Sequence, residues 1–229
     1  MLSNALQTAV STWRELLKNR ELRDVVMLYT AYMVAMTGTQ LTTLQLYMVS
    51  PALAFTPADI GYTYTGMSVI SVAATQPIAY LADKYSKPLL NVVGCGLVAT
   101  AALSIPYTTN LPELGLAVCP LALGTTILGS VPNAHIVNIS PKRDTAQAQS
   151  LLRTCGDVGM LLGGTCAGLL GELASVETAM RSNGVMLLMF VSYLGVRQMY
   201  LVDTSSRIVK AIDGRAENLE PLPKDKLVQ

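Results

Sequence analysis

The sequence predicts an all-α membrane protein with six transmembrane helices. Hydrophobic residues make up 51% of the 229 and charged residues only 14%, whereas a soluble domain carries about 25% charge. Asp59 is the one charged residue between positions 25 and 82, and Glu113 is the one between 88 and 140. These gaps far exceed the roughly 18 apolar residues that indicate a membrane span. A soluble α-domain would not repeat such uncharged runs in succession.

The first 24 residues are predicted to form a cytoplasmic helix that precedes the membrane domain. Their apolar residues recur at the spacing of one helix face, with basic residues beside them. This pattern is typical of a helix that lies on a membrane surface. A plain connecting helix fits equally well, and the acidic residues Glu15, Glu21 and Asp24 disfavour a targeting helix.

Six apolar segments follow and form the predicted transmembrane domain, residues 25–202. The connections between them are short and rich in Pro, Asn, Asp and Ser, which are turn residues. Residues 203–229 are predicted to form a polar cytoplasmic tail. The predicted spans cover residues 25–49, 60–82, 88–105, 114–137, 145–170 and 183–202.

The distribution of lysine and arginine predicts the orientation of these spans. Basic residues occur before the first span, in the second and fourth connections, and in the tail, whereas Arg181 is the only one predicted on the opposite side. Because basic loops stay in the cytoplasm, both termini are expected to be cytoplasmic. The net charge of +1 and the lone histidine give no reason to expect a nucleic-acid partner, a metal or a cofactor.

Two sequence patterns resemble the major facilitator superfamily. The turn "AYLADKYSK" resembles the family's loop motif G-x-x-x-D-[RK]-x-G-[RK]-[RK], in which Asp83, Lys84 and Lys87 match. Ala79 and Ser86 stand where glycine is usual, and a proline replaces the last basic residue. The segment "RDTAQAQSLLRTCGDVGMLLGGTCAGLLG" resembles the fifth helix of a family half, particularly the C-terminal half, and "LLKNRELRD" is similar to the basic linker before the seventh helix.

This resemblance implies a six-helix half of a twelve-helix secondary transporter that moves a small solute by alternating access. It also implies a second six-helix half, as a separate chain, a second copy or a missing N-terminal part. The alternative is a non-transporting six-helix membrane scaffold or assembly factor. A membrane enzyme is disfavoured, because the sequence has no H-E-x-x-H or G-x-S-x-G motif and no facing pair of acids in its spans.

The charged turn is the first candidate functional site. Asp83 can accept hydrogen bonds from N–H groups at a neighbouring helix start, where the helix dipole favours an anion. Lys84, Lys87 and Arg143 lie in cytoplasmic connections and are candidates for gating or coupling. The alternative is that these basic residues act only as topology signals.

A second candidate is the pair Arg153 and Asp157, one helical turn apart in the fifth span. Charges within a span are costly, about 2.5–3.5 kcal/mol each at its centre, and therefore indicate a functional or structural role. The pair is expected to form a gate or a proton-coupling site, or else a structural ion pair.

The first span carries a polar stripe at 100° per residue, expected to line a substrate cavity. Hydroxyl, amide and aromatic groups without charge suit a neutral, amphipathic or aromatic ligand. The alternative is bonding between helices. The stripe comprises Tyr29, Tyr32, Gln40, Thr43 and Tyr47.

Glycines in the fifth span are predicted to let helices approach closely. Gly159, Gly163, Gly164 and Gly168 approximate the family pattern G-x-x-x-G-P-x-x-G-G. The resemblance implies that this contact seals the two halves.

Overall fold

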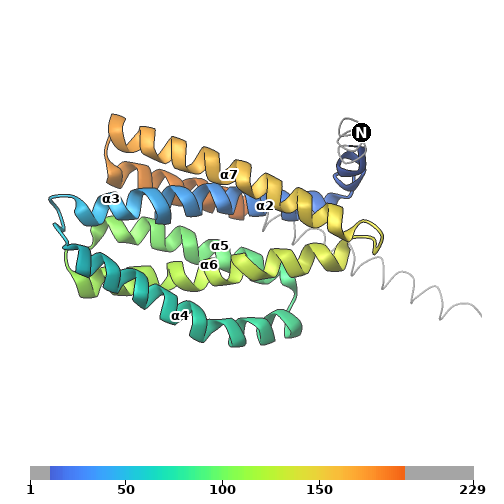
Figure 1. Ribbon diagram of the computed structural model, residues 1–229, viewed down its shortest axis with the longest axis horizontal. Helices are drawn as coiled ribbons and strands as arrows, with labels where there is room; N and C mark the ends of the chain where they lie inside the picture. Colours follow the sequence, from blue (N-terminus) through green and yellow to red (C-terminus); the bar gives the residue numbers. More distant parts are fainter. Residues whose placement is uncertain (1–10, 194–229) are drawn as a thin grey trace, which may run out of the picture. The chain divides into compact units, whose positions relative to one another are not determined.

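The computed structural model describes residues 11–193, and this part of the chain consists of helices and short connections without strands. The predicted 203–229 tail, the first ten residues and the end of the predicted sixth span lie outside the described residues. A short helix over 11–16 precedes the long helices, and a helix that begins at residue 176 follows them. The elements between them are α2 (Arg20–Met36), η1 (Thr37–Thr43), α3 (Leu44–Val49), α4 (Pro57–Lys84), α5 (Lys87–Ser104), η2 (Ile105–Tyr107), α6 (Leu111–Ile139) and α7 (Thr145–Leu173) (Figure 1).

The first long helix is interrupted by a π-helix. It begins earlier than predicted because the Asn19 side chain accepts a hydrogen bond from the Glu21 N–H, at 3.1 Å, and caps α2. The seven residues of η1 then replace α-helical turns between α2 and α3. Such π segments are rare and often mark functional positions.

Two later helices begin at side-chain caps. Thr56 and Asp59 form a capping box at the start of α4, with the Thr56 hydroxyl 2.7 Å from the Asp59 carboxylate. The last helix begins at 176 rather than at the predicted 183, because Ser175 Oγ accepts a hydrogen bond from the Thr178 N–H, at 3.1 Å. The charges of Glu177 and Arg181 therefore lie in the first turns of a helix and not in a loop.

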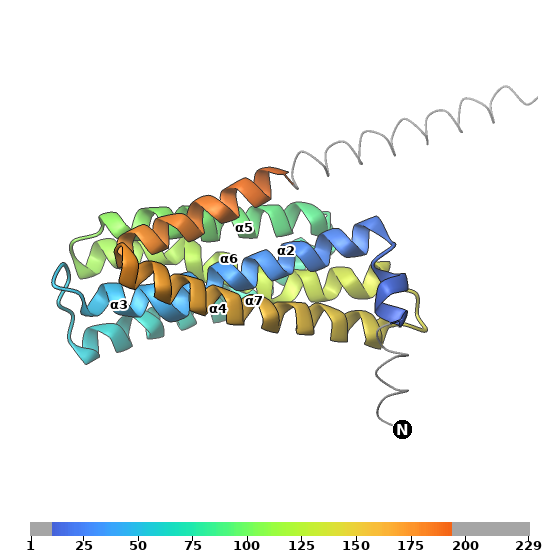
Figure 2. The same ribbon diagram turned by 90° about the horizontal axis from the view of Figure 1, so that it is seen from above.

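Four of the long helices lie side by side in the order α7, α2, α6, α4. Helix α7 packs along α2, α2 touches α6, and α6 packs against both α4 and α5 (Figures 1 and 2). The last helix packs against this group, because Asn183 reaches Gly38 of η1 and Gly184 lies against Leu103 of α5. The main core fills the space between these helices and includes Leu28, Met48, Val98, Leu121 and Leu187.

The segment before α2 packs onto one end of these helices. Leu16 is buried, and Trp13 and Leu17 are partly buried against Val26, Ile136 and Leu151. The apolar face predicted for residues 1–24 therefore contacts protein over its described part.

Apolar side chains also cover much of the outside. Val72, Leu116, Leu161, Leu173 and Met189 are each at least 70% exposed, and exposed apolar surface of this extent indicates an apolar surrounding. By length and composition, two helices of the described part are apolar enough to cross a membrane, 87–107 and 111–139, each with a mean hydropathy of 1.8. The 28 or 29 residues of α4 and α7 make each about 42 Å long, which exceeds the roughly 30 Å of a bilayer core.

Candidate functional site

Two different surfaces of α7 point away from the helices it packs on. One is aliphatic, with Val158, Leu162, Leu169 and Leu173 all at least half exposed. The other, turned by roughly 120° around the helix, carries polar and small residues, and we name it the polar face of α7. It comprises Gln149, Ser150, Arg153, Asp157, Gly164 and Gly168.

Arg153 and Asp157 lie on this polar face with exposed side chains. They do not form an ion pair, because within residues 11–193 the ion pair found within 4.0 Å joins His135 and Glu21. Their exposure explains this separation, since a solvated charge does not need its neighbour as a buried one does. Both charged groups are therefore open to other partners.

Tyr29 of α2 brings a hydroxyl group to the same charges. Its ring lies against Gly156, where an added Cβ would come within 2.6 Å of Cε1. The charges of both Arg153 and Asp157 act on the Tyr29 phenol. The half-buried Tyr29 therefore lies beside α7 at Gly156, in the neighbourhood of a guanidinium and a carboxylate.

The remaining residues of the predicted stripe face the protein. Tyr32, Thr43 and Tyr47 are at most 3% exposed. The Tyr47 hydroxyl donates to the Thr108 carbonyl, at 2.9 Å, and the Thr43 hydroxyl donates to the Gly38 carbonyl, also at 2.9 Å. In this structure these three side chains hold helices and turns together and do not line an open cavity.

Gln40 lies at the edge of the main core. It is partly buried, and its backbone carbonyl accepts a hydrogen bond from the Tyr64 hydroxyl of α4, at 2.9 Å. Its side-chain Oε1 is buried, and no hydrogen-bond partner for it is found among the described residues. An amide oxygen in this position can accept a hydrogen bond from a ligand or from water.

A polar stripe on α6 was missed by the sequence reasoning. Thr126, Ser130 and Asn133 lie on one side of α6 and are exposed or partly exposed. Each donates a hydrogen bond to a carbonyl of its own helix, as Asn133 Nδ2 does to Gly129 at 2.9 Å, and keeps acceptor capacity free. Their spacing of four and three residues was the available signal.

The charged turn lies at the end of α4. Asp83, Lys84 and Arg143 are exposed and Lys87 is partly buried. Lys84 Nζ lies 5.8 Å from the centre of the Tyr85 ring, within the range of a cation–π contact. Across residues 11–193 no hydrogen bond or ion pair engages the Asp83 side chain. Its carboxylate is therefore available to a group outside this part of the chain.

The four predicted packing glycines divide into two pairs. A Cβ on Gly159 would lie 2.7 Å from the Thr30 carbonyl oxygen, and one on Gly163 would lie 2.8 Å from Val34 Cα. These two glycines let α7 touch the backbone of α2. Gly164 would make only ordinary contacts and Gly168 would meet nothing within 4 Å. The second pair lies on the polar face, where Gly164 borders Thr37 and Thr42 of η1 and Gly168 is unobstructed.

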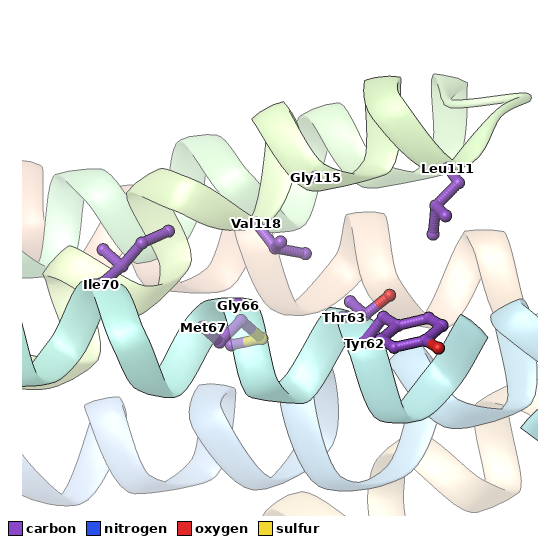
Figure 3. Close-up of a pocket in the computed structure, with 8 residues that line it drawn as sticks. All are labelled: Tyr62, Thr63, Gly66, Met67, Ile70, Leu111, Gly115 and Val118. Carbon is purple, nitrogen blue, oxygen red and sulfur yellow. The ribbon is translucent and has the colours of Figure 1, made fainter. Parts of the chain in front are cut away.

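A small pocket lies between α4 and α6, near the ends opposite to the charged turn. Its volume is about 170 Å³, and Figure 3 shows Gly66 and Gly115 leaving the space that side chains would fill. Its other lining residues are Tyr62, Thr63, Met67, Ile70, Leu111 and Val118. The lining is apolar apart from two hydroxyl groups, so it suits only an apolar group.

The chain's one histidine ties α6 to the start of α2. His135 is 4% exposed and its Nε2 lies 3.3 Å from the Glu21 carboxylate. No group of three or more metal-binding side chains occurs within 11–193. The main candidate site within 11–193 is the polar face of α7 with the neighbouring Tyr29, and the α6 stripe is a second candidate. Both offer hydrogen-bonding groups, and the α7 face also offers charge.

Comparison with known families identifies this arrangement. A family model described as Major Facilitator Superfamily matches residues 9–223. No curated protein matches the chain. Because the match covers nearly all of the 229 residues, the chain belongs to the Major Facilitator Superfamily and is an integral, multi-pass membrane transporter.

Proposed function

We propose that this chain is a six-helix unit of a secondary transporter that moves a small solute by alternating access. The six spans are α2 to α3, α4, α5, α6, α7 and the helix that begins at 176, with both termini in the cytoplasm. The polar face of α7, Tyr29 and the α6 stripe form the inner surface of this unit. A second six-helix unit, on a separate chain, a second copy or another part of the same polypeptide, completes the solute pathway.

The observation that carries this proposal is the exposure of two opposite charges on α7. A charge at the centre of a membrane helix costs about 2.5–3.5 kcal/mol on insertion scales. Val158 and Leu162 occupy a separate aliphatic face that suits lipid, so the charges do not need to face it. Water or a second protein unit is the surrounding that lowers this cost, and both are present in a transport pathway.

Each group then has a role in this proposal. Arg153, Asp157 and the Tyr29 hydroxyl bind the solute or exchange a proton with it. Gly164 and Gly168 let the second unit approach the polar face, since small residues permit close helix contact. Asp83 caps a helix of the second unit, and Lys84, Lys87 and Arg143 hold the turn on the cytoplasmic side.

A solute-uptake screen tests this proposal. Cells that express the full chain with its second unit are given a panel of radiolabelled neutral, zwitterionic and aromatic solutes. Asp157→Asn should abolish uptake of the transported solute without lowering the amount of protein in the membrane. Glu172→Gln is the matched control, because Glu172 is exposed on α7 but lies off the polar face. Equal uptake by the two variants would remove Asp157 from the pathway.

The scaffold function is favoured by one observation, that Ala79 and Ser86 stand in the charged turn where the family's loop motif has glycine. Native mass spectrometry of the tagged chain in mild detergent separates the two functions. A transporter unit should carry the mass of a second six-helix unit. A stable species at the 24.4 kDa of one chain, together with no uptake in the screen, would support the scaffold.

A further inference from the structure

The outer surface of the last described helix carries a groove that the transport pathway does not use. The groove is shallow and open, and all of its lining residues belong to this one helix. The lining residues follow one another at helical spacing on a single side of the helix. They are Thr178, Arg181, Ser182, Val185, Met186 and Met189.

This groove faces away from the other helices. The same helix packs inward through a different set of residues, which includes Met180, Asn183 and Leu187. Met189 is 70% exposed and Val185 is 42% exposed. The apolar part of the groove therefore lies on the outside of the described helices.

Polarity changes along the groove in the order of a phospholipid. Hydroxyl and guanidinium groups occupy the first two turns, at Thr178, Arg181 and Ser182. Thioether and aliphatic side chains follow, and Met189 lies about 12 Å further along the axis than Arg181. A phospholipid placed alongside would meet polar groups with its phosphate and apolar groups with its acyl chain. Methionine side chains adapt readily to such a chain.

The Arg181 guanidinium stacks on an exposed tyrosine at the polar end of the groove. Its guanidinium carbon lies 4.7 Å from the centre of the Tyr107 ring, at the end of the spans opposite to the charged turn. Tyr107 is 70% exposed, as expected for an aromatic residue at a membrane interface. Glu177 is one turn away, but no carboxylate lies within 4.0 Å of Arg181 in the described part of the chain. The planar fork of a guanidinium matches phosphate oxygens.

We propose that this groove binds a membrane phospholipid, with Arg181 and the neighbouring hydroxyl groups on its phosphate and Val185, Met186 and Met189 along its acyl chain. The site depends only on the chain's place in a membrane. A failure here would leave the transport proposal intact.

Native mass spectrometry of the purified full chain tests the site. The probes are dioleoylphosphatidylglycerol and dioleoylglycerol, which share acyl chains and differ in the phosphate group. The wild-type chain should retain the phospholipid and lose the diacylglycerol. Arg181→Gln should weaken phospholipid binding roughly tenfold, which corresponds to loss of charge-assisted hydrogen bonds. Tyr107→Leu should weaken it less.

Arg20→Gln is the matched control, since Arg20 is also exposed but lies at the start of α2. It should bind phospholipid as the wild type does. Melting temperatures in detergent check that each variant is folded, and Arg181→Lys provides a second, milder change that should bind with intermediate strength. Equal phospholipid binding by Arg181→Gln and Arg20→Gln, or retention of diacylglycerol as strong as that of phospholipid, would overturn the proposal.

Discussion

Replacing Gly163 with alanine should separate α7 from α2. The new Cβ would lie 2.8 Å from Val34 Cα and even closer to the Val34 carbonyl oxygen, whereas ordinary van der Waals contact begins at 3.4 Å. The obstacle is backbone, which cannot rotate aside as a side chain can. The two helices must therefore move apart locally by at least about 0.6 Å, in an interior that is packed as tightly as an organic crystal.

Overpacking of this kind costs about 1–3 kcal/mol. The higher helix propensity of alanine offsets about 1 kcal/mol of that cost, so Gly163→Ala should destabilise the protein by up to about 2 kcal/mol net. Gly168→Ala is the matched control on the same helix, because its Cβ would meet nothing within 4 Å. That variant should be as stable as the wild type or slightly more stable.

Thermal unfolding in detergent, followed by size-exclusion chromatography with fluorescence detection, measures the difference. Gly163→Ala should lose the folded peak at a temperature several degrees below the wild type and below Gly168→Ala. Equal melting temperatures for the two variants would refute the close contact between α7 and α2. The closeness of Tyr29 to Arg153 and Asp157, which depends on this contact, would then be refuted as well.

Three further results are expected. Thr56→Ala removes the cap of α4 and should lower stability by about 1 kcal/mol in the same assay, while Thr56→Ser should not. Hydrogen bonds from Thr56 hold the pKa of Asp59 below its usual 3.8. The stabilising effect of this carboxylate should therefore be complete above pH 3.8 and be lost as the pH falls below that value. A melting temperature that rises on acidification through this range would contradict the hydrogen bonds between Thr56 and Asp59. Tyr47→Phe removes the hydroxyl that donates a hydrogen bond to the buried Thr108 carbonyl at 2.9 Å. The loss should lower the free energy of unfolding by about 1–3 kcal/mol. An unchanged melting temperature would show that this hydrogen bond is absent.

Hydropathy located the helices better than it located their ends. The predicted fifth span and α7 begin at the same residue, Thr145. The last helix begins seven residues before its predicted start, because the Ser175 cap and the charged residues after it lower the hydropathy of a helical turn. Caps are local hydrogen bonds, and an average over an apolar window does not register them.

The periodicity of the sequence predicts which polar residues share a helix face, but not what that face contacts. Tyr32 and Tyr47 share one side of the first span, yet both are buried against other helices. The spacing of Arg153 and Asp157 predicts a pair within the fifth span, yet both side chains are exposed and form no ion pair within 4.0 Å. The distinction depends on tertiary neighbours such as Thr108, 61 residues away from Tyr47, which no local pattern reveals.

The π-helix was also outside the reach of the pattern analysis. A projection at 100° per residue assumes continuous α-helix, but η1 changes the rotation between α2 and α3. Residues on either side of Thr37–Thr43 are therefore not related by the angle that the projection assigns. The motif residue Asp83 shows a different limit, because its proposed partner lies outside the described part of the chain.

The central claim is that the polar face of α7 contacts protein or water while the neighbouring aliphatic face contacts lipid. Spin labels on Gly164→Cys and Leu162→Cys test it directly, in a chain whose four native cysteines are replaced by alanine or serine. The two positions lie at nearly the same depth, and Leu162 is 51% exposed on the aliphatic face. In native membranes the label at 162 should collide readily with dissolved oxygen, which concentrates in lipid, and the label at 164 should collide with it far less. Equal, lipid-like oxygen accessibility at both positions would contradict the claim.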